Sequence, residues 1–278
     1  MSAVTARGWV RRHGVLTALG VIVVYVLLAA GLGNVLSDLV SDDHEAAQFA
    51  LGHLIPLPIG IVLLLLAVRW AGNSDAVWRE RPTPTLTPHR WYLLVIPVLA
   101  VGISLIESTQ IPWAERGIGI VLLVAVGTLL VGLGEELAIR GVLLTAVRER
   151  HGEFVTLLVT SLVFAVVHIP GSLVSGNPPV VIVIQVVGLS VVGATYYWVR
   201  RVTGRLWAGV LVHALTDWVL YLSGSDDVPA TSLSRGQTPT DLIVGNTELV
   251  LWLFLAIGVV SVIREDRRNR DHRPTVTP

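Results

Sequence analysis

The sequence predicts an all-α integral membrane protein with about eight transmembrane helices, and three observations lead to this prediction. Hydrophobic residues make up 53% of the 278 residues, and the mean hydropathy is +0.71. Charged residues make up only 14%, whereas a typical soluble domain has about 25%. Eight segments approach the roughly 20 apolar residues that a helix needs to cross a bilayer core. This composition excludes a soluble enzyme and a disordered chain, and the net charge of 0 excludes a nucleic-acid-binding protein.

The predicted spans follow one another through loops that are too short to form a soluble domain. In chain order they are Val15–Leu36, Ala46–Val68, Trp91–Ile106, Ile118–Val147, Phe154–Ile169, Val180–Val199, Leu206–Leu222 and Thr247–Ile263. The fourth is too long for a straight crossing and is expected to tilt or to extend into the cytoplasm. The fifth is short and ends at Pro170. The first lacks a convincing cleavage site, so we expect it to remain as an anchor rather than to be removed as a signal peptide.

The placement of arginine predicts how these spans are oriented. Cytoplasmic loops are rich in basic residues, and all 20 basic residues of this chain are arginine. Of these, 17 fall on the side that holds both termini, Arg116 and Arg235 fall on the other side, and Arg140 lies within a span. Both termini are therefore expected in the cytoplasm. The lack of lysine is typical of a GC-rich bacterial genome, so we predict a multi-pass protein of a bacterial plasma membrane.

Three predicted spans carry ionisable residues near their middle, where a charged side chain costs at least about 2.5–3.5 kcal/mol. The fourth span contains Glu135, Glu136 and Arg140, the fifth contains His168 after Phe164, and the seventh contains His213 and Asp217. Counted from the predicted cytoplasmic ends at about 1.5 Å per residue, Glu135, His168 and Asp217 lie about 18 to 22 Å deep. Each of these features alone could be a packing contact, but their common depth predicts one shared buried site.

Helix geometry separates the two glutamates of the fourth span. Glu136 and Arg140 are four residues apart with the acid first, which favours an ion pair. Glu135 points about 100° away from Glu136, so it is left without a local counter-charge and is the candidate general base. Three nearby glycines would let a neighbouring helix approach this acidic segment closely: Gly132, Gly134 and Gly141.

The two other motif-bearing spans supply imidazole rings. His213 and Asp217 are four residues apart and therefore share a face of the seventh span. Phe164 lies one turn before His168, and we expect it to stack on the imidazole ring or to form a wall beside it. A carboxylate and two imidazoles in a shielded site suit the activation of a water molecule.

Two routes for this activation remain open. In the metal-free route, Glu135 takes a proton from water with help from His168, while His213 and its partner stabilise the developing oxyanion. In the alternative, His168, His213 and Glu135 hold a divalent metal, with zinc as the best fit, and leave one position for water. The chain contains no cysteine and no serine placed as an obvious nucleophile.

These residues resemble the motif set of the CPBP family of intramembrane peptidases, the CAAX proteases and bacteriocin-processing enzymes also called the Abi family. The set reads Glu-Glu-x-x-x-Arg from Glu135 to Arg140, Phe-x-x-x-His from Phe164 to His168 and His-x-x-x-Asp from His213 to Asp217. The resemblance covers about Ile118 to Leu222. It implies an all-α membrane peptidase with a conical cavity among these helices.

The resemblance also implies a role for each motif residue. In the family's scheme, Glu135 and His168 activate the water, and His213 forms the oxyanion pocket with the residue at Asp217. The prenyl protease has asparagine where this chain has Asp217, and an ionised aspartate cannot donate to an oxyanion. Asp217 must then be protonated, orient His213 or ligate a metal. Because the family was first regarded as metal-dependent, both routes stay open.

On this basis we expect three regions. Residues 1–117 carry the first three spans and a cytoplasmic loop rich in arginine and proline, residues 118–222 form the peptidase core, and residues 223–278 carry an outer loop, the last span and a basic cytoplasmic tail. The predicted function is an endopeptidase that acts on a peptide or membrane-protein substrate among membrane lipids, without nucleic acid.

The resemblance leaves the substrate open. Eukaryotic and archaeal relatives remove the C-terminal tripeptide from prenylated CAAX proteins, whereas bacterial members would act on leader peptides or on other membrane proteins. Two alternatives to an endopeptidase remain. One is a non-catalytic immunity or scaffold protein with the same fold, and the other is a proton-coupled transporter, because intramembrane glutamate and histidine also serve as proton relays.

Overall fold

The computed structural model describes residues 14–41, 44–72, 74–224 and 238–271, and these contain helices, turns and loops but no β-strand. The helices in chain order are α2 (Gly14–Val26), the π-helix η1 (Leu27–Leu32), α3 (Gly33–Ser37), α4 (Glu45–Leu54), α5 (Pro56–Ala71), α6 (Ser74–Trp78), the 3₁₀-helices η3 (Thr83–Thr85) and η4 (Trp91–Leu94), α7 (Val95–Glu107), the 3₁₀-helices η5 (Ser108–Gln110) and η6 (Trp113–Glu115), α8 (Ile118–Glu136), the π-helix η7 (Leu137–Leu143), α9 (Leu144–Arg148), α10 (Glu153–Val166), α11 (Ile169–Val174), α12 (Pro179–Thr203), α13 (Leu206–Ser223) and α14 (Pro239–Asp271). The predicted all-α fold is confirmed.

By length and composition, eight stretches of helix in the described residues can cross a membrane, as predicted. They are Gly14–Ser37, Glu45–Ala71, Trp91–Gln110, Ile118–Arg148, Glu153–Val174, Pro179–Thr203, Leu206–Ser223 and Pro239–Asp271. The protein is therefore a multi-pass membrane protein. Its orientation in the membrane stays a prediction, and the N-terminal arginines and Arg235, on which that prediction partly depends, lie outside the described residues.

The helix that contains the predicted last span, roughly Thr247–Ile263, extends beyond that span at both ends. It runs over 33 residues from Pro239 to Asp271. At its start, the Asp241 backbone N–H donates to the Thr238 hydroxyl at 3.1 Å, and the Thr238 backbone N–H donates to the Asp241 carboxylate at 3.0 Å. This reciprocal cap stabilises polar turns that a hydropathy pattern does not detect.

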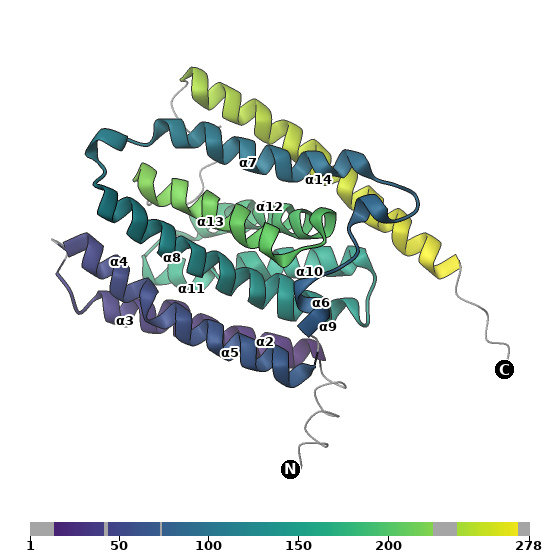
Figure 1. Ribbon diagram of the computed structural model, residues 1–278, viewed down its shortest axis with the longest axis horizontal. Helices are drawn as coiled ribbons and strands as arrows, with labels where there is room; N and C mark the ends of the chain where they lie inside the picture. Colours follow the sequence, from purple (N-terminus) through teal and green to yellow (C-terminus); the bar gives the residue numbers. More distant parts are fainter. Residues whose placement is uncertain (1–13, 42–43, 73, 225–237, 272–278) are drawn as a thin grey trace, which may run out of the picture.

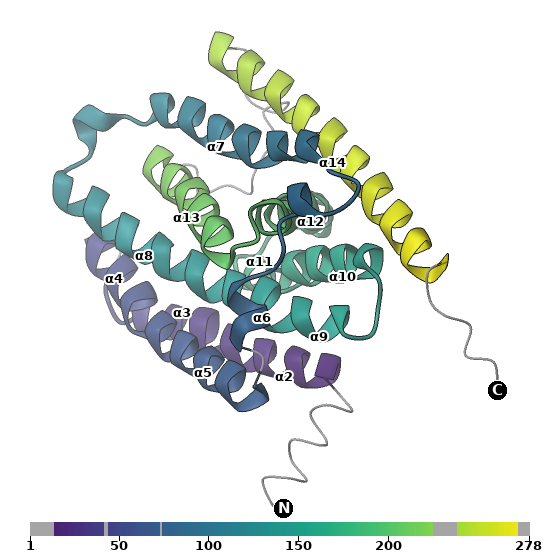
Figure 2. The same ribbon diagram turned by 45° about the vertical axis from the view of Figure 1, so that its right-hand side comes forward.

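The helices form three layers (Figure 1). Helices α8, α10, α12 and α13 lie in the middle, α2, α4 and α5 cover one side, and α7 with α14 covers the other. The turned view keeps this order (Figure 2). Helix α13 comes very close to α8, because a Cβ at Gly132 would lie only 2.9 Å from the Val210 carbonyl oxygen. The middle layer therefore brings the three motif-bearing spans against one another.

The long fourth span is not one regular helix. It runs as α8 to Glu136, then as the π-helix η7 from Leu137 to Leu143, and ends as α9. Most of η7 is buried, including Arg140. A π-helical turn has a wider hydrogen-bonding pattern than an α-helix and is common at functional sites. Here it begins directly after the two glutamates that the sequence singles out.

A second group of buried charges lies where α9 meets α10. We call it the arginine cluster, and its members are Glu80, Arg90, Arg148, Glu153, Arg200, Arg201 and Glu265. The cluster also fixes the loop between α6 and α7, because Glu80 belongs to that loop and the Thr83 hydroxyl donates to the Arg201 carbonyl at 2.8 Å. It ties the loop to α9, α10, α12 and α14.

Candidate active site

Four predicted site residues from three spans come together in the middle layer. Glu135 Oε2 lies 3.9 Å from Nε2 of His168 and 3.9 Å from Nε2 of His213. The same nitrogen of His213 lies 3.4 Å from Oδ2 of Asp217. The structure thus joins one carboxylate from α8, one imidazole from the α10–α11 junction, and an imidazole with its acid from α13.

Glu136 forms the predicted ion pair and has a second partner that sequence reasoning missed. Arg140 Nη1 donates to Glu136 Oε1 at 2.9 Å, and both side chains are 0% exposed. The same carboxylate oxygen accepts a hydrogen bond from Nδ1 of His213 at 3.2 Å. Gly209 on α13 makes room for this contact, because a Cβ there would lie 2.9 Å from Glu136 Oε2. Glu136 therefore neutralises Arg140 and also orients the His213 ring.

His168 lies in a break between two helices. Helix α10 ends at Val166, and Pro170 sits in the first turn of α11, where a proline is well tolerated because no backbone N–H is needed there. The fifth span therefore continues beyond Pro170, contrary to the prediction. The Nδ1 of His168 donates to the Phe164 carbonyl oxygen at 2.7 Å. In the neutral ring this leaves Nε2, which faces Glu135, as an acceptor.

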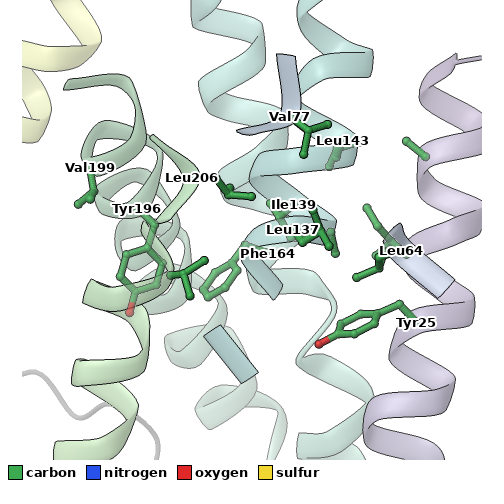
Figure 3. Close-up of a cluster of buried hydrophobic side chains, with 14 of the residues drawn as sticks. Tyr25, Leu64, Val77, Leu137, Ile139, Leu143, Phe164, Tyr196, Val199 and Leu206 are labelled. Carbon is green, nitrogen blue, oxygen red and sulfur yellow. The ribbon is translucent and has the colours of Figure 1, made fainter. Parts of the chain in front are cut away.

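Aromatic rings enclose the histidines. The Phe164 ring centroid lies 5.2 Å from that of His168 and 5.7 Å from that of His213, so Phe164 forms a wall beside both rings. The guanidinium of Arg140 lies 4.5 Å above the Phe164 ring. Tyr196 stacks on His213 with centroids 4.6 Å apart and an angle of 20°. Figure 3 shows Phe164 and Tyr196 side by side in the buried cluster.

Exposure divides these side chains into two groups. The Glu135, His168 and Asp217 side chains are 24%, 31% and 20% exposed, whereas His213 is 4% and Glu136 is 0% exposed. The first three side chains are therefore partly open to their surroundings, although Oε2 of Glu135 is itself buried. The two others are held inside the protein by their hydrogen bonds.

The predicted zinc set of His168, His213 and Glu135 does not fit this geometry. In the part of the chain that the structure describes, no group of three or more His, Cys, Asp and Glu side chains is arranged to hold a metal ion. A ligating imidazole must present an unprotonated nitrogen. Both nitrogens of His213 face carboxylates, since Nδ1 contacts Glu136 and Nε2 lies near Asp217. The ring is placed to donate from both nitrogens.

Sequence reasoning missed Tyr196, because its position in the chain suggests a different role. Tyrosine in a membrane span is enriched near the bilayer interface, where its hydroxyl meets water. Tyr196 instead is 2% exposed and packs between Phe164 and His213. Its position near the end of the predicted sixth span makes it resemble an interface anchor. Only the packing of α12 against α13 reveals the contact.

A comparison with known protein families found a match for the part of the chain that carries the candidate site. Residues 117–219 match the family model described as type II CAAX prenyl endopeptidase Rce1-like. No curated protein and no solved structure matched the chain. The matched residues include Glu135, His168, His213 and Asp217. Residues 117–219 are therefore similar to the Rce1-like domain of the CPBP family, the family whose motifs this sequence resembles.

Proposed function

We propose that this protein is an intramembrane endopeptidase that hydrolyses a peptide bond with a water molecule activated by Glu135 and His168. The Rce1-like domain supports a membrane peptidase of the CAAX-protease type. The observation that carries the mechanism is the distance of 3.9 Å from Glu135 Oε2 to Nε2 of both His168 and His213. This distance is too long for a direct hydrogen bond, and polar groups at such a separation can both bond to one water molecule lying beside them.

The hydrolysis then proceeds as follows. The water oxygen bonds to the substrate carbonyl carbon while Glu135 takes one of its protons and His168 Nε2 accepts a hydrogen bond from the other. The negative charge that develops on the carbonyl oxygen is stabilised by N–H donation from His213 Nε2. When the C–N bond breaks, Glu135 returns its proton to the leaving nitrogen. The products are a free amine and a new C-terminal carboxylic acid, which becomes a carboxylate when the second proton of the water leaves through His168 Nε2 to solvent.

Asp217 acts through His213 in this mechanism. An ionised carboxylate only accepts hydrogen bonds, so it cannot donate to the oxyanion. Asp217 lies 3.4 Å from His213 Nε2 and therefore favours a protonated ring. Glu136, Arg140 and Phe164 support the site by holding His213 and His168 from their buried sides.

We propose a peptide within or near the membrane as the substrate. The description of the matched family names CAAX prenyl endopeptidases, so a peptide with a prenylated C-terminal CAAX sequence is the first probe to use. Leader peptides and other membrane proteins are the substrates to search for in the native membrane, which we expect to be a bacterial plasma membrane.

The test compares the peptide termini in membrane fractions of two strains. Both are deletion strains: one carries the wild-type gene and the other carries the Glu135→Gln variant, at matched expression. The substitution preserves the shape of the side chain but removes the general base. We expect new termini that need Glu135, and these would also identify the substrate and the cleaved bond. Identical termini in both strains would overturn the proposal and favour a non-catalytic membrane protein with the same fold.

A further inference from the structure

Tyr25 lies on α2, outside the Rce1-like domain, but its side chain reaches the helix that carries the candidate base. It is 3% exposed, and no described residue forms a hydrogen bond with its hydroxyl. Figure 3 shows the hydroxyl pointing away from α2 into the buried cluster, toward the side on which Phe164 lies. A buried phenol normally has a hydrogen-bond partner, so this hydroxyl requires an explanation.

Two glycines on neighbouring helices create the space that Tyr25 occupies. A Cβ at Gly60 of α5 would lie 2.8 Å from Cδ2 of the Tyr25 ring. A Cβ at Gly134 of α8 would lie 2.8 Å from Cζ and would collide with the hydroxyl oxygen. The hydroxyl therefore lies against the α8 backbone at Gly134, the residue directly before Glu135.

The Glu135 carboxylate itself also has an unpaired atom. Its Oε2 is buried, and no described residue donates a hydrogen bond to it. Buried polar atoms without a protein partner are generally satisfied by ordered water, and such a water needs at least two polar neighbours. The Tyr25 hydroxyl and the Glu135 carboxylate supply two, one from α2 and one from α8.

A π-helix follows both Tyr25 and Glu135 in the chain. The π-helix η1 begins at Leu27, two residues after Tyr25, and the π-helix η7 begins at Leu137, two residues after Glu135. Both irregular segments therefore begin one half-turn beyond the level at which Tyr25 of α2 packs against Gly134 of α8. Inserted π-turns are frequent at functional sites because they change the direction of nearby side chains.

We propose that Tyr25 is a positioning residue of the active site: its hydroxyl and the Glu135 carboxylate hold one water molecule between them, which fixes the direction of that carboxylate. This inference rests on the function proposed above, because Tyr25 acts through Glu135. The water shared with His168 and His213 is consumed in the reaction, whereas a second water held by Tyr25 would stay in place and keep the Glu135 carboxylate directed at the two imidazoles. Helix α2 is then a part of the active site that the family match does not cover.

Tyr25→Phe tests this proposal because it removes only the hydroxyl. With an internally quenched, farnesylated peptide that ends in a CAAX sequence as the probe, we expect kcat to fall about 10- to 100-fold, the effect of one hydrogen bond to a charged group. KM should change by less than about twofold, because no substrate contact is lost. Tyr221→Phe is the matched control: it also removes a hydroxyl from a span, one that contacts His53 at 3.3 Å, and it should leave kcat unchanged.

A second measurement does not depend on activity. The infrared carboxylate band of Glu135, assigned by its loss in Glu135→Gln, should shift in Tyr25→Phe and not in Tyr221→Phe. A wild-type protein that cleaves nothing would overturn the proposed function but would leave this spectroscopic result to decide the role of Tyr25. An unchanged band, or a fall in kcat that only follows a lower unfolding temperature, would overturn the proposal for Tyr25.

Discussion

The candidate active site and the arginine cluster are both buried groups of acids and bases, but their carboxylates are paired differently. In the arginine cluster, Glu153 accepts hydrogen bonds from Arg148 at 3.0 Å and from the Tyr197 hydroxyl at 2.6 Å. Glu265 likewise accepts from Arg90 at 2.6 Å and from Arg201 at 2.7 Å. In the candidate site, no described residue donates a hydrogen bond to Glu135 Oε2.

This difference separates a structural group of charges from a reactive one. A buried charge is tolerated when close partners offset its loss of hydration, and the arginine cluster meets this condition with four arginines around three glutamates. A carboxylate that must take a proton from water cannot have its oxygen occupied by an arginine. Within the site itself, Glu136 Oε1 is paired with Arg140 in the manner of the cluster, whereas Glu135 Oε2 faces only the two imidazoles, each at 3.9 Å.

The largest expected effect is the loss of activity in His168→Ala. Cleavage should fall about 10²- to 10⁴-fold, the usual contribution of a general acid–base group. The unfolding temperature should hardly change, since the described hydrogen bond of His168 is to a carbonyl of its own helix. His89→Ala is the control, because His89 also bonds a backbone carbonyl, at 2.8 Å, but outside the site. Equal activity of the two variants would contradict the comparison.

Glu136→Gln should have the largest effect on stability. It leaves the fully buried Arg140 without its charge partner, which lowers the free energy of unfolding by about 3–5 kcal/mol. Thermal unfolding in detergent measures this effect. Replacing both residues with leucine should recover most of the stability, because no unpaired charge remains. Activity should not recover, because His213 still lacks its partner at Nδ1, and full activity of this double variant would contradict the role given to Glu136.

Glu153→Gln should lower stability without changing the chemistry. Its hydrogen bonds with Arg148 and Tyr197 are lost or weakened, so the free energy of unfolding should fall by about 1–3 kcal/mol. Measured on folded protein at a temperature well below unfolding, kcat should equal that of the wild type. A lower kcat with unchanged stability would show that the arginine cluster takes part in the reaction.

Asp217→Asn should have a smaller effect on activity, less than about tenfold. The amide oxygen would still face His213 Nε2, as the carboxylate oxygen does at 3.4 Å, so we expect transition-state stabilisation to fall by only about 1 kcal/mol. Asp217→Ala, which removes the acceptor, should reduce kcat further. If Asp217→Asn instead abolishes cleavage, the carboxylate has a role that orienting His213 does not explain.

Removal of divalent metals should have the smallest effect of all. The described residues offer no site for a metal ion, so dialysis against a chelator should leave the rate of cleavage unchanged. A rate that falls on chelation and returns when zinc is added would restore the zinc route of His168, His213 and Glu135.

The spans and one contact of the site could be predicted because both depend on local periodicity. Apolar segments identified all eight helical stretches, and the four-residue spacing predicted the pair of Glu136 and Arg140. The last helix was underestimated because its polar turns are stabilised by capping, which hydropathy does not measure. The π-helix η7 was not predicted either, since nothing in a run of apolar residues distinguishes it from an α-helix.

The contacts between distant segments could not be predicted. Tyr25 and Gly134 are more than 100 residues apart in the chain, and Glu136 and His213 are 77 apart. The estimated depth in the membrane placed the motif residues at one level, but it did not show which of their atoms would face one another. The zinc alternative stayed open for the same reason, because it depends on the direction of both His213 nitrogens. The division into three regions and the roles of the site residues stay predictions.

The most direct test of the account is the rate at which purified wild-type protein and Glu135→Gln cut one peptide in proteoliposomes. The peptide is the one whose cleavage in membrane fractions depends on Glu135, and both proteins are matched for their unfolding temperature. The account predicts cleavage by the wild type and background hydrolysis by Glu135→Gln. Equal rates for the two proteins would show that this unpaired carboxylate is not the general base.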